Sequence, residues 1–397
     1  MAVSPPDATL TIVGNSPGEV SGWAIPIAAE ARRVAEEQGR SLEVALCLPP
    51  CQFASGQEHG AAAASGLFDH IVDPRDVVRL CLGLRGWSPA GAPSVLHVGG
   101  DFWYSRRLAR RWRAPAFAFV ERAHVARDHR HFERIFVPTP QVRERLRRNG
   151  VPEDRMMITG DPRHDAVMMD RQGAELDGNG VHPRVTFLPG SRDAIFSAVF
   201  PFWVRTAAAL RPYLPDARLQ TVISPFVSPT VQQALVKQHR AAIHAAGLEV
   251  DYGGWRRVAG ADLALTIPGT NTLELALLRI PSLVVLPLSL TPEIPVEGIL
   301  DLLLRIPIVG PKVRLAIARR YVARAPYLAL PNMRAGRQIM PELVGALTPE
   351  QVAAESARLI RDEGARAAMA RGLEAIPQEP GASRRILEAM APVDSAA

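Results

Sequence analysis

Residues 261–288, ADLALTIPGTNTLELALLRIPSLVVLPL, decide the fold of this chain. The apolar residues 263–265 predict a short buried strand. A tight turn follows at Pro268-Gly269-Thr270, where glycine removes the restriction that a Cβ imposes on the backbone. A helical pattern runs from residue 271 or 272 to residue 278, and residues 282–288 form a second apolar strand. The order strand, glycine turn, helix, strand predicts one βαβ unit.

The loop of this unit has two interpretations. The N–H groups and the positive dipole end of a helix N-terminus favour a phosphate, so Gly269 and Thr270 are candidate phosphate ligands. Glu274, in the first helical turn, is a candidate partner for a ribose diol. Alternatively, Thr270 and Asn271 cap the helix and Glu274 only complements its dipole.

Composition limits the class of protein. A chain of 397 residues with 47% hydrophobic and 22% charged residues is globular and long enough for two domains. The net charge of +6 comes almost wholly from arginine, with lysine only at Lys237 and Lys312, so it is weak evidence for a nucleic-acid partner and none is expected. Cys47, Cys51 and Cys81 form no metal-binding pattern, which indicates a reduced cytoplasmic protein without structural zinc or disulfides.

Membrane-spanning and secretion signals are not expected. The first 14 residues contain no basic n-region and no long apolar core, so no signal peptide is predicted. No uninterrupted apolar run is long enough to span a bilayer. Any contact with a membrane is therefore expected from one side.

The amino-terminal part begins with a predicted strand at residues 9–13, a glycine-rich loop at 14–22 and a helix at 23–38. Three glycines between a strand and a helix indicate either close approach to a ligand or a flexible connection. Their spacing is not G-x-G-x-x-G, so a dinucleotide site is not supported.

A second candidate site follows the predicted strand 94–98. Asp101 comes after Gly99 and Gly100 and is either a general base or the cap of the next helix, residues 104–112. That helix combines tryptophan with arginine, which is typical either of a phosphate-rich or headgroup surface or of a solvated basic face. Its basic and indole side chains are Trp103, Arg106, Arg107, Arg110, Arg111, Trp112 and Arg113.

A second β/α series begins at residues 184–188. The loop Pro189-Gly190-Ser191-Arg192 leads into a predicted helix at 193–210, and an arginine there can bridge a diphosphate. Strand and helix alternate in both halves, which predicts an α/β protein with two Rossmann-like, doubly wound domains facing each other across a cleft. The predicted domains are residues 1–169, residues 184–365 with an insertion at 289–326, and a helical tail at 366–397.

Five motifs in order resemble the lipid-A-disaccharide synthase family or a related sister family. They are Gly18-Glu19-Val20-Ser21-Gly22, Asp101-Phe102, Leu188–Arg192 (LPGSR), Gly269–Glu274 (GTNTLE), and residues 327–343 with Tyr327, Leu330-Pro331-Asn332, Gly336-Arg337 and Glu342-Leu343. The resemblance implies a GT-B glycosyltransferase that is inverting, needs no metal or other cofactor, and transfers a hexose from a UDP-sugar to a lipid-linked acceptor. In the family the reaction joins UDP-diacylglucosamine to acylated glucosamine 1-phosphate.

The resemblance also implies roles for individual residues. Asp101 would be the base, and Gly190, Ser191 and Arg192 would hold the departing diphosphate. Gly269, Thr270 and Glu274 would hold diphosphate and ribose, and Asn332 would contact the donor. The residues expected to line the cleft are Gly18, Glu19, Ser21 and Gly22.

Three departures from the family pattern concern the identity of the sugar and the lipid. Trp23 stands where the family loop continues with aspartate. The acidic residue expected soon after LPGSR is replaced by residues 193–196, Asp-Ala-Ile-Phe. The family's Ser-Pro-Ser-Val-Trp-Ala-Trp stretch is missing near residues 120–127.

The segment 294–324 is apolar at first and basic afterwards, a pattern typical of a helix that lies on an anionic bilayer. It predicts peripheral association with the inner face of the cytoplasmic membrane; the alternative is a helical hairpin packed on protein. The tail either packs on the amino-terminal domain or contributes to a homodimer. For the whole chain, the alternatives to a transferase are a UDP-sugar 2-epimerase-like enzyme and a non-catalytic membrane-associated protein with the same fold.

Overall fold

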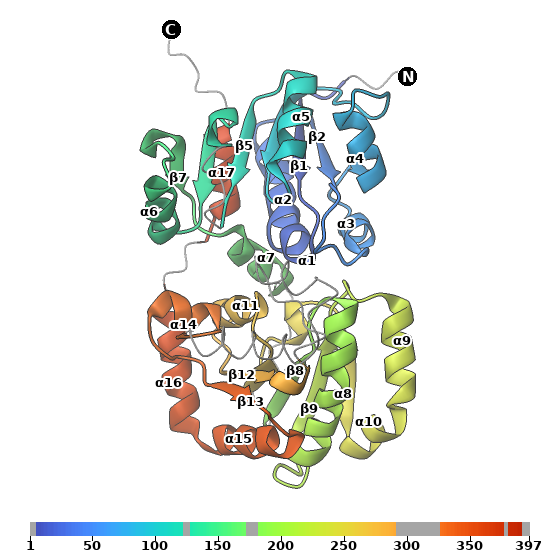
Figure 1. Cartoon of the computed structure of the whole chain (residues 1–397), viewed down its shortest axis with the longest axis vertical. Helices are drawn as coiled ribbons and strands as arrows, with labels where there is room; N and C mark the ends of the chain where they lie inside the picture. Colours follow the sequence, from blue (N-terminus) through green and yellow to red (C-terminus); the bar gives the residue numbers. More distant parts are fainter. Residues whose placement is uncertain (1–4, 122–127, 172–181, 291–325, 377–379, 391–397) are drawn as a thin grey trace, which may run out of the picture. The chain divides into compact units, whose positions relative to one another are not determined.

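A computed structural model describes residues 5–121, 128–171, 182–290, 326–376 and 380–390. The chain forms two compact units (Figure 1). Unit 1 comprises Met1–Met169 with Gln378–Ala397, and unit 2 comprises Asp170–Pro377. The predicted insertion, and with it the membrane prediction for 294–324, lies outside the described residues except at its two edges.

Unit 1 is built on a seven-stranded parallel sheet of order β3-β2-β1-β4-β5-β6-β7. Its strands are β1 (Ala8–Val13), β2 (Leu42–Cys47), β3 (His70–Val72), β4 (Ala92–His97), β5 (Ala116–Phe119), β6 (Arg134–Val137) and β7 (Met156–Ile158). Its helices are α1 (Pro17–Glu19), the π-helix η1 (Val20–Ala24), α2 (Ile25–Glu37), α3 (Glu58–Ser65), α4 (Pro74–Cys81), α5 (Phe102–Trp112), α6 (Pro140–Arg148), α7 (Pro162–Arg171) and α17 (Ala382–Met390), with 3-10 turns η2 (His129–His131) and η3 (Glu153–Arg155).

Unit 2 repeats this plan with a six-stranded parallel sheet of order β10-β9-β8-β11-β12-β13. Its strands are β8 (Arg184–Leu188), β9 (Arg218–Ile223), β10 (Leu248–Tyr252), β11 (Leu263–Thr266), β12 (Ser282–Pro287) and β13 (Glu342–Gly345). Its helices are α8 (Asp193–Leu210), α9 (Pro229–Gln238), α10 (Arg240–Ala246), α11 (Asn271–Leu277), α14 (Leu330–Ala335), α15 (Pro349–Arg361) and α16 (Glu363–Glu374), with 3-10 turns η4 (Trp255–Arg257) and η5 (Leu288–Leu290).

In each sheet the order in which successive strands are added reverses at one point. This reversal confirms the prediction of two doubly wound sheets. In unit 1 the order reverses between β1 and β4, and in unit 2 between β8 and β11. Ligands of such folds bind at the carboxyl ends of the strands beside this switch point. A ligand is therefore expected at the loops after β1, β4, β8 and β11. These loops carry four of the five motifs.

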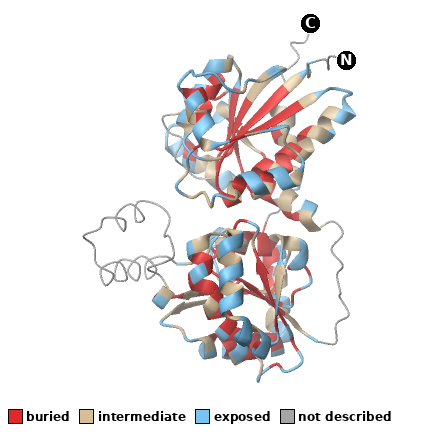
Figure 2. Ribbon diagram, turned by 90° about the vertical axis from the view of Figure 1, so that its right-hand side faces the viewer, coloured by how far each residue is buried: buried red, intermediate tan, exposed pale blue. Residues whose placement is uncertain are grey.

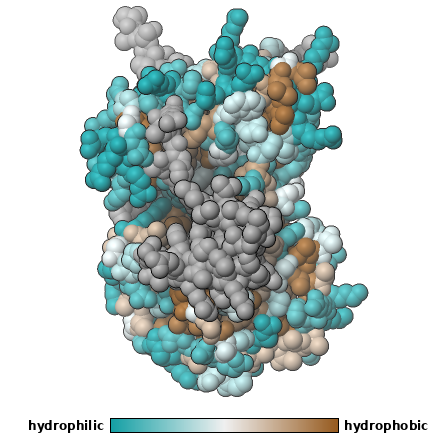
Figure 3. Space-filling view, in the orientation of Figure 1, coloured by the Kyte–Doolittle hydropathy of each residue, from teal (hydrophilic) through white to brown (hydrophobic). Residues whose placement is uncertain are grey.

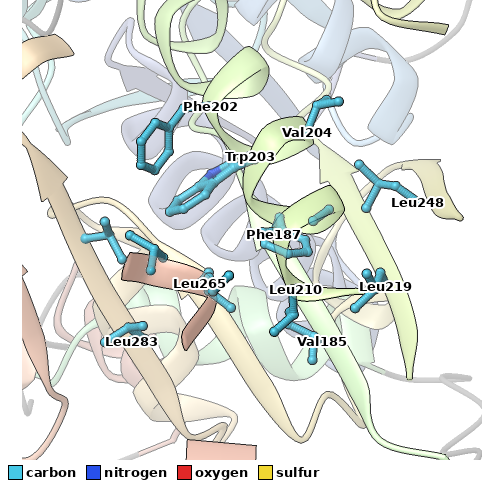
Figure 4. Packing of buried hydrophobic residues seen from close by; sticks show 14 of the residues in the cluster. Val185, Phe187, Phe202, Trp203, Val204, Leu210, Leu219, Leu248, Leu265 and Leu283 are labelled. Carbon is cyan, nitrogen blue, oxygen red and sulfur yellow. The ribbon is translucent and has the colours of Figure 1, made fainter. Parts of the chain in front are cut away.

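Burial of the apolar strands holds each unit together. Figure 2 shows the strands of both sheets mostly in red, the colour of buried residues. In unit 2 the side chains of α8 meet those of β8, β9, β10, β11 and β12 in one core (Figure 4). At its centre Trp203 is fully buried, and its indole Nε1 donates to the carbonyl oxygen of Leu188 at 3.2 Å. This bond fixes the end of β8, immediately before the LPGSR loop.

Helix α8 also has the length and apolar composition to cross a membrane, the one helix in the described ranges that does. Of its most apolar 18-residue window, 61% is buried inside unit 2. Phe196, Phe200 and Trp203 pack in the core, and Thr206 bonds the carbonyl oxygen of Phe202 within the helix. Its apolar character is therefore explained by its place in the core.

Two predicted boundaries are wrong. The predicted tail 366–397 begins inside α16, which Asp362 caps by accepting the N–H of Ala365 at 2.8 Å and which packs in unit 2 through buried Met369 and Leu373. The part of the tail that joins unit 1 begins at Gln378 and includes α17; there Asp165 accepts the backbone N–H groups of Gly381 and Ser383 at 2.7 and 2.8 Å. The predicted loop 14–22 is the second error, because α1 already begins at Pro17.

Candidate functional site

The loop after β1 in unit 1 is anchored by Glu19. Its Oε2 accepts the backbone N–H of Asn15 at 2.7 Å, and a Cβ added to Gly99 would overlap its carboxyl group. Burial raises the pKa of Glu19, while hydrogen bonds from Asn15, Ser16 and Gly100 oppose the shift. The carboxyl group of Glu19 therefore joins the loop after β1 to the loop after β4, and only glycine fits at position 99.

The loop after β4 presents Asp101 at its end. Asp101 is exposed and stands at the N-cap of α5, where its Oδ1 accepts the backbone N–H of Trp103 at 2.7 Å. The capping interpretation is thus correct for Oδ1. The cap also orients the carboxylate, because one oxygen is held against the helix. The second oxygen, Oδ2, takes no part in this cap.

The remaining residues of the first motif turn toward their own unit rather than outward. Pro17 at the first helical position and extended Ser16 before it start α1, as proline prefers. The hydroxyl of Ser21 donates to the carbonyl oxygen of Pro17 at 2.7 Å. Gly22 is buried, and a Cβ there would lie 3.3 Å from Nε of Arg163. The motif therefore forms the first turns of a helix with a π-helical insertion, not a loop; Gly18, which has no atom within 4 Å of a built Cβ, is its open position.

In unit 2 the loop after β8 carries LPGSR. Gly190 has a φ of +96°, and a Cβ there would lie 2.7 Å from Cγ2 of Ile195, so the turn requires glycine. Arg192 stands at the N-cap position of α8 with an extended backbone and is half-buried, as is Ser191. Asp193, the next residue in the chain, has a structural role. Its carboxylate accepts hydrogen bonds from the backbone N–H and the hydroxyl of Ser228, both at 2.7 Å.

The loop after β11 lies beside it, because β8 and β11 are hydrogen-bonded neighbours. Gly269 is exposed, with a φ of +152° and no atom within 4 Å of a built Cβ. Thr270 is the N-cap residue of α11, without a side-chain cap bond. Glu274, in the first turn of α11, is only 6% exposed. The open part of this loop is its glycine turn.

Asn332 does not fit the predicted role of a donor contact. It is fully buried, and its amide is used inside the protein. Nδ2 donates to the carbonyl oxygen of Met340 at 2.8 Å and to Glu342 at 2.7 Å, while Oδ1 accepts the N–H groups of Ile339 and Met340 at 2.7 and 2.9 Å. Both hydrogens and both lone pairs are thus taken, so Asn332 ties α14 to β13.

Comparison with known proteins agrees with the motifs. Residues 162–291 match the family model of lipid-A-disaccharide synthetase. The lipid-A-disaccharide synthase of Anaeromyxobacter dehalogenans is 34% identical over 209 residues, which are 51% of this chain and 48% of that protein. The synthase of Thiobacillus denitrificans is 27% identical over 319 residues, 78% of this chain and 72% of that protein.

The chain is therefore similar to lipid-A-disaccharide synthases over the matched regions. It spans about half the length of the curated relatives that it matches first, 48% in the case above. The crystal structure of a UDP-GlcNAc 2-epimerase from Neisseria meningitidis bound to UDP-GlcNAc is similar with a TM-score of 0.56 and 13% identity, over 96% of this chain and 98% of that one. Identity this low shows the fold alone, which is α/β of the GT-B type.

One departure from the family pattern has a structural account. Trp23, which replaces the family's aspartate, is 8% exposed, and its Nε1 donates to Oδ1 of Asp161 at 3.1 Å. Arg163, 1% exposed, lies over the Trp23 ring at 5.1 Å and pairs with Asp161 at 3.0 Å and with Glu121 at 3.3 Å. Asp161 thus supplies a carboxylate to η1 from the loop after β7.

Sequence reasoning assigned no role to Asp161, Arg163 or Glu121. The available signal was the turn Gly160-Asp161-Pro162-Arg163, which carries two charged residues directly after a short apolar strand. Such residues lie at the carboxyl edge of a parallel sheet, where sites form. Arg163 therefore places a buried positive charge at this edge, where it is paired with the carboxylates of Asp161 and Glu121.

Replacing Asn332 with alanine is expected to lower the free energy of unfolding by about 2–3 kcal/mol, because two backbone N–H groups, a carbonyl group and a carboxylate lose a buried partner. Chemical denaturation of the variant measures the loss. Asn332→Asp distinguishes the acceptor side of the amide from its donor side. It retains an acceptor for the N–H groups of Ile339 and Met340 but brings a carboxylate against Glu342. An unchanged denaturation midpoint in both variants would contradict the structural role. Asn332 would then again be a candidate ligand contact.

Proposed function

We propose that the protein is a glycosyltransferase that moves a sugar from a UDP-sugar to a lipid-linked acceptor. The observation that carries the proposal is the placement of four family motifs at the switch points of two parallel sheets. Two lie at each sheet: the motifs of Glu19 and Asp101 in unit 1, and those of Arg192 and Gly269 in unit 2. The family match covers both loops of unit 2.

Unit 2 supplies the groups for the nucleotide diphosphate. The guanidinium of Arg192 can donate two parallel hydrogen bonds to phosphate oxygens and neutralise charge that grows as the diphosphate leaves. The neighbouring turns offer backbone N–H groups, and Gly269 leaves space for a ligand to approach them. Gly269, Thr270 and Glu274 would hold the diphosphate and the ribose.

Unit 1 supplies the base. As the acceptor hydroxyl attacks the anomeric carbon, its proton passes to Oδ2 of Asp101. The new bond joins the acceptor oxygen to the anomeric carbon, and the bond from that carbon to the phosphate oxygen breaks with its electron pair on UDP. Attack opposite the leaving group inverts the configuration. The positive charge of Arg192 would neutralise the negative charge on the departing diphosphate, which is the role of a divalent ion in other transferases. We therefore propose a metal-independent reaction.

The finer parts of the proposal follow the family. They are a donor such as UDP-diacylglucosamine, an acceptor such as acylated glucosamine 1-phosphate or a related glycolipid, and a place at the inner face of the cytoplasmic membrane. A homodimer through the C-terminal region belongs to the same group of proposals. The 2-epimerase alternative has the support of the shared fold only, which does not distinguish reactions.

Calorimetric titration with UDP, UMP, dTDP and NAD tests the proposal first. The protein is expected to prefer UDP, and Arg192→Ala is expected to raise the dissociation constant for UDP by about 10- to 100-fold, because a charge-assisted pair is lost. Arg205→Ala is the matched control, since Arg205 is an exposed arginine of the same helix.

The outcome decides between the alternatives. A preference for UDP that is weakened in Arg192→Ala and retained in Arg205→Ala supports a nucleotide-sugar site and justifies a search for the acceptor. Absence of binding to all four nucleotides would overturn the proposal in favour of a non-catalytic protein. Equal weakening in both arginine variants would show only a general effect of charge.

A further inference from the structure

His97, the last residue of β4, is bonded to the helix that Asp101 caps. Nδ1 of His97 shares a hydrogen bond of 2.8 Å with the hydroxyl of Ser105 in α5, and both side chains are buried. Only the three residues 98–100 separate His97 from Asp101. The bond therefore closes the chain on itself around the loop after β4 and joins the end of the strand to the first turns of α5.

Ring packing holds the same turn of α5. The centre of the His97 ring lies 4.2 Å from that of Phe102, the residue after Asp101. The ring of Phe132 lies 5.5 Å from Phe102 and 6.2 Å from His97. Figure 3 shows a mostly hydrophilic surface on unit 1, whereas His97 and Phe132 are buried, at 3% and 1% exposed. Contacts between rings at such distances are favourable, so His97 restrains the start of α5 in two ways.

His97 is suited to hold a group in place rather than to exchange protons. Burial lowers the pKa of its imidazole to about 3, so the ring is uncharged at neutral pH. A buried ring also makes no contact with a substrate in solution. Any effect of His97 on a reaction therefore has to pass through its partners in α5, the helix that begins directly after Asp101.

We propose that His97 is a positioning residue, which fixes the direction of the Asp101 carboxylate by holding Ser105 and Phe102. The proposal rests on the proposed function, in which Asp101 is the base. Glu19 restrains the loop after β4 at Gly99, whereas His97 restrains the helix that follows this loop. Without the bond to His97 the first turn of α5 can shift with its cap intact, and a shift of about 1 Å at a catalytic group slows a reaction by about 100-fold.

The test is the double variant His97→Phe/Ser105→Ala of the full chain. It keeps a ring at position 97 and removes both polar partners, so the denaturation midpoint is expected to stay close to normal. The turnover number for transfer from UDP-diacylglucosamine to acylated glucosamine 1-phosphate is expected to fall by about tenfold or more, because the carboxylate is no longer held. The dissociation constant for UDP is expected to stay unchanged, since the groups proposed to bind UDP belong to unit 2.

Hydrogen exchange tests the geometry without a substrate. In the double variant the backbone N–H groups of residues 101–105 are expected to exchange about 5- to 10-fold faster, because one buried hydrogen bond no longer holds the turn. Thr9→Val is the matched control: it breaks another buried bond of unit 1, in which Oγ1 of Thr9 donates to Oε2 of Glu43 at 2.7 Å. Thr9 pairs with Pro93 at the start of β4, away from Asp101. The control is expected to lower the denaturation midpoint only.

The combined results decide the role of His97. Slower turnover with faster exchange at residues 101–105, both absent from Thr9→Val, supports the positioning role. Normal turnover or unchanged exchange in the double variant would overturn it, and so would an equal loss of turnover in Thr9→Val. Absence of transfer by the unaltered protein would instead contradict the proposed function, and faster exchange in the double variant would still show that His97 fixes the turn that Asp101 caps.

Discussion

Asp101→Asn is expected to lower the turnover number by about 100- to 10,000-fold and to leave the affinity for UDP unchanged. The reason is that asparagine can cap α5 as well as aspartate does, because its Oδ1 can accept the N–H of Trp103. The variant loses only the ability to accept a proton from the acceptor hydroxyl. Steady-state transfer from a UDP-sugar to a lipid acceptor measures the turnover, and calorimetry measures UDP binding.

Asp101→Ala provides the contrast, since it removes the base and the cap together. Its free energy of unfolding is expected to fall by about 1 kcal/mol, whereas that of Asp101→Asn stays the same. If Asp101→Asn turns over at the normal rate while Asp101→Ala is destabilised, Asp101 is a helix cap only. Another group at the edge of unit 1, with Glu121 the first to test, would then have to serve as the base.

The fold could be predicted from sequence because buried parallel strands and core helices leave local signals. The strand 184–188 and the helix 193–210 have the predicted bounds. Strands covered on both faces are continuous apolar runs between turn residues, so their ends are sharp. By contrast, α9 and α10 are two helices that meet at His239, a break at which the sequence has no proline or glycine.

The site could be predicted only as far as its loops. The sequence predicts that Glu19 lines the cleft and that Asn332 contacts the donor. In the structure Glu19 accepts a backbone N–H of its own unit, and Asn332 accepts two. The partners of Trp23 and Asp101 illustrate the limit. Asp161 is 138 residues from Trp23 in the chain, so a local pattern cannot pair them. Asp101 caps a residue two positions away, and the local pattern predicts this cap as one of two interpretations.

The role of Glu19 predicts a large effect of the smallest possible substitution, Gly99→Ala. The new Cβ would overlap the Glu19 carboxyl group, which cannot swing away without breaking its bonds to the loop after β1. The loop after β4 must move instead, and Asp101 moves with it. Turnover is expected to fall by about 100-fold, because a shift of about 1 Å at a catalytic group has that effect, and overpacking is expected to cost about 1–3 kcal/mol of stability.

A double-mutant cycle isolates the contact. Glu19→Ala alone leaves the N–H of Asn15 without its acceptor, so it is destabilised. It also removes the atoms that alanine at position 99 would meet, so Gly99→Ala should cost nothing further in that background. Gly60→Ala, an exposed helical glycine of the same unit with no atom near its built Cβ, is the control and should lose neither activity nor stability. Additive losses in the double variant would show that Gly99 is needed for a reason other than Glu19, and the carboxyl group would then have no part in placing Asp101.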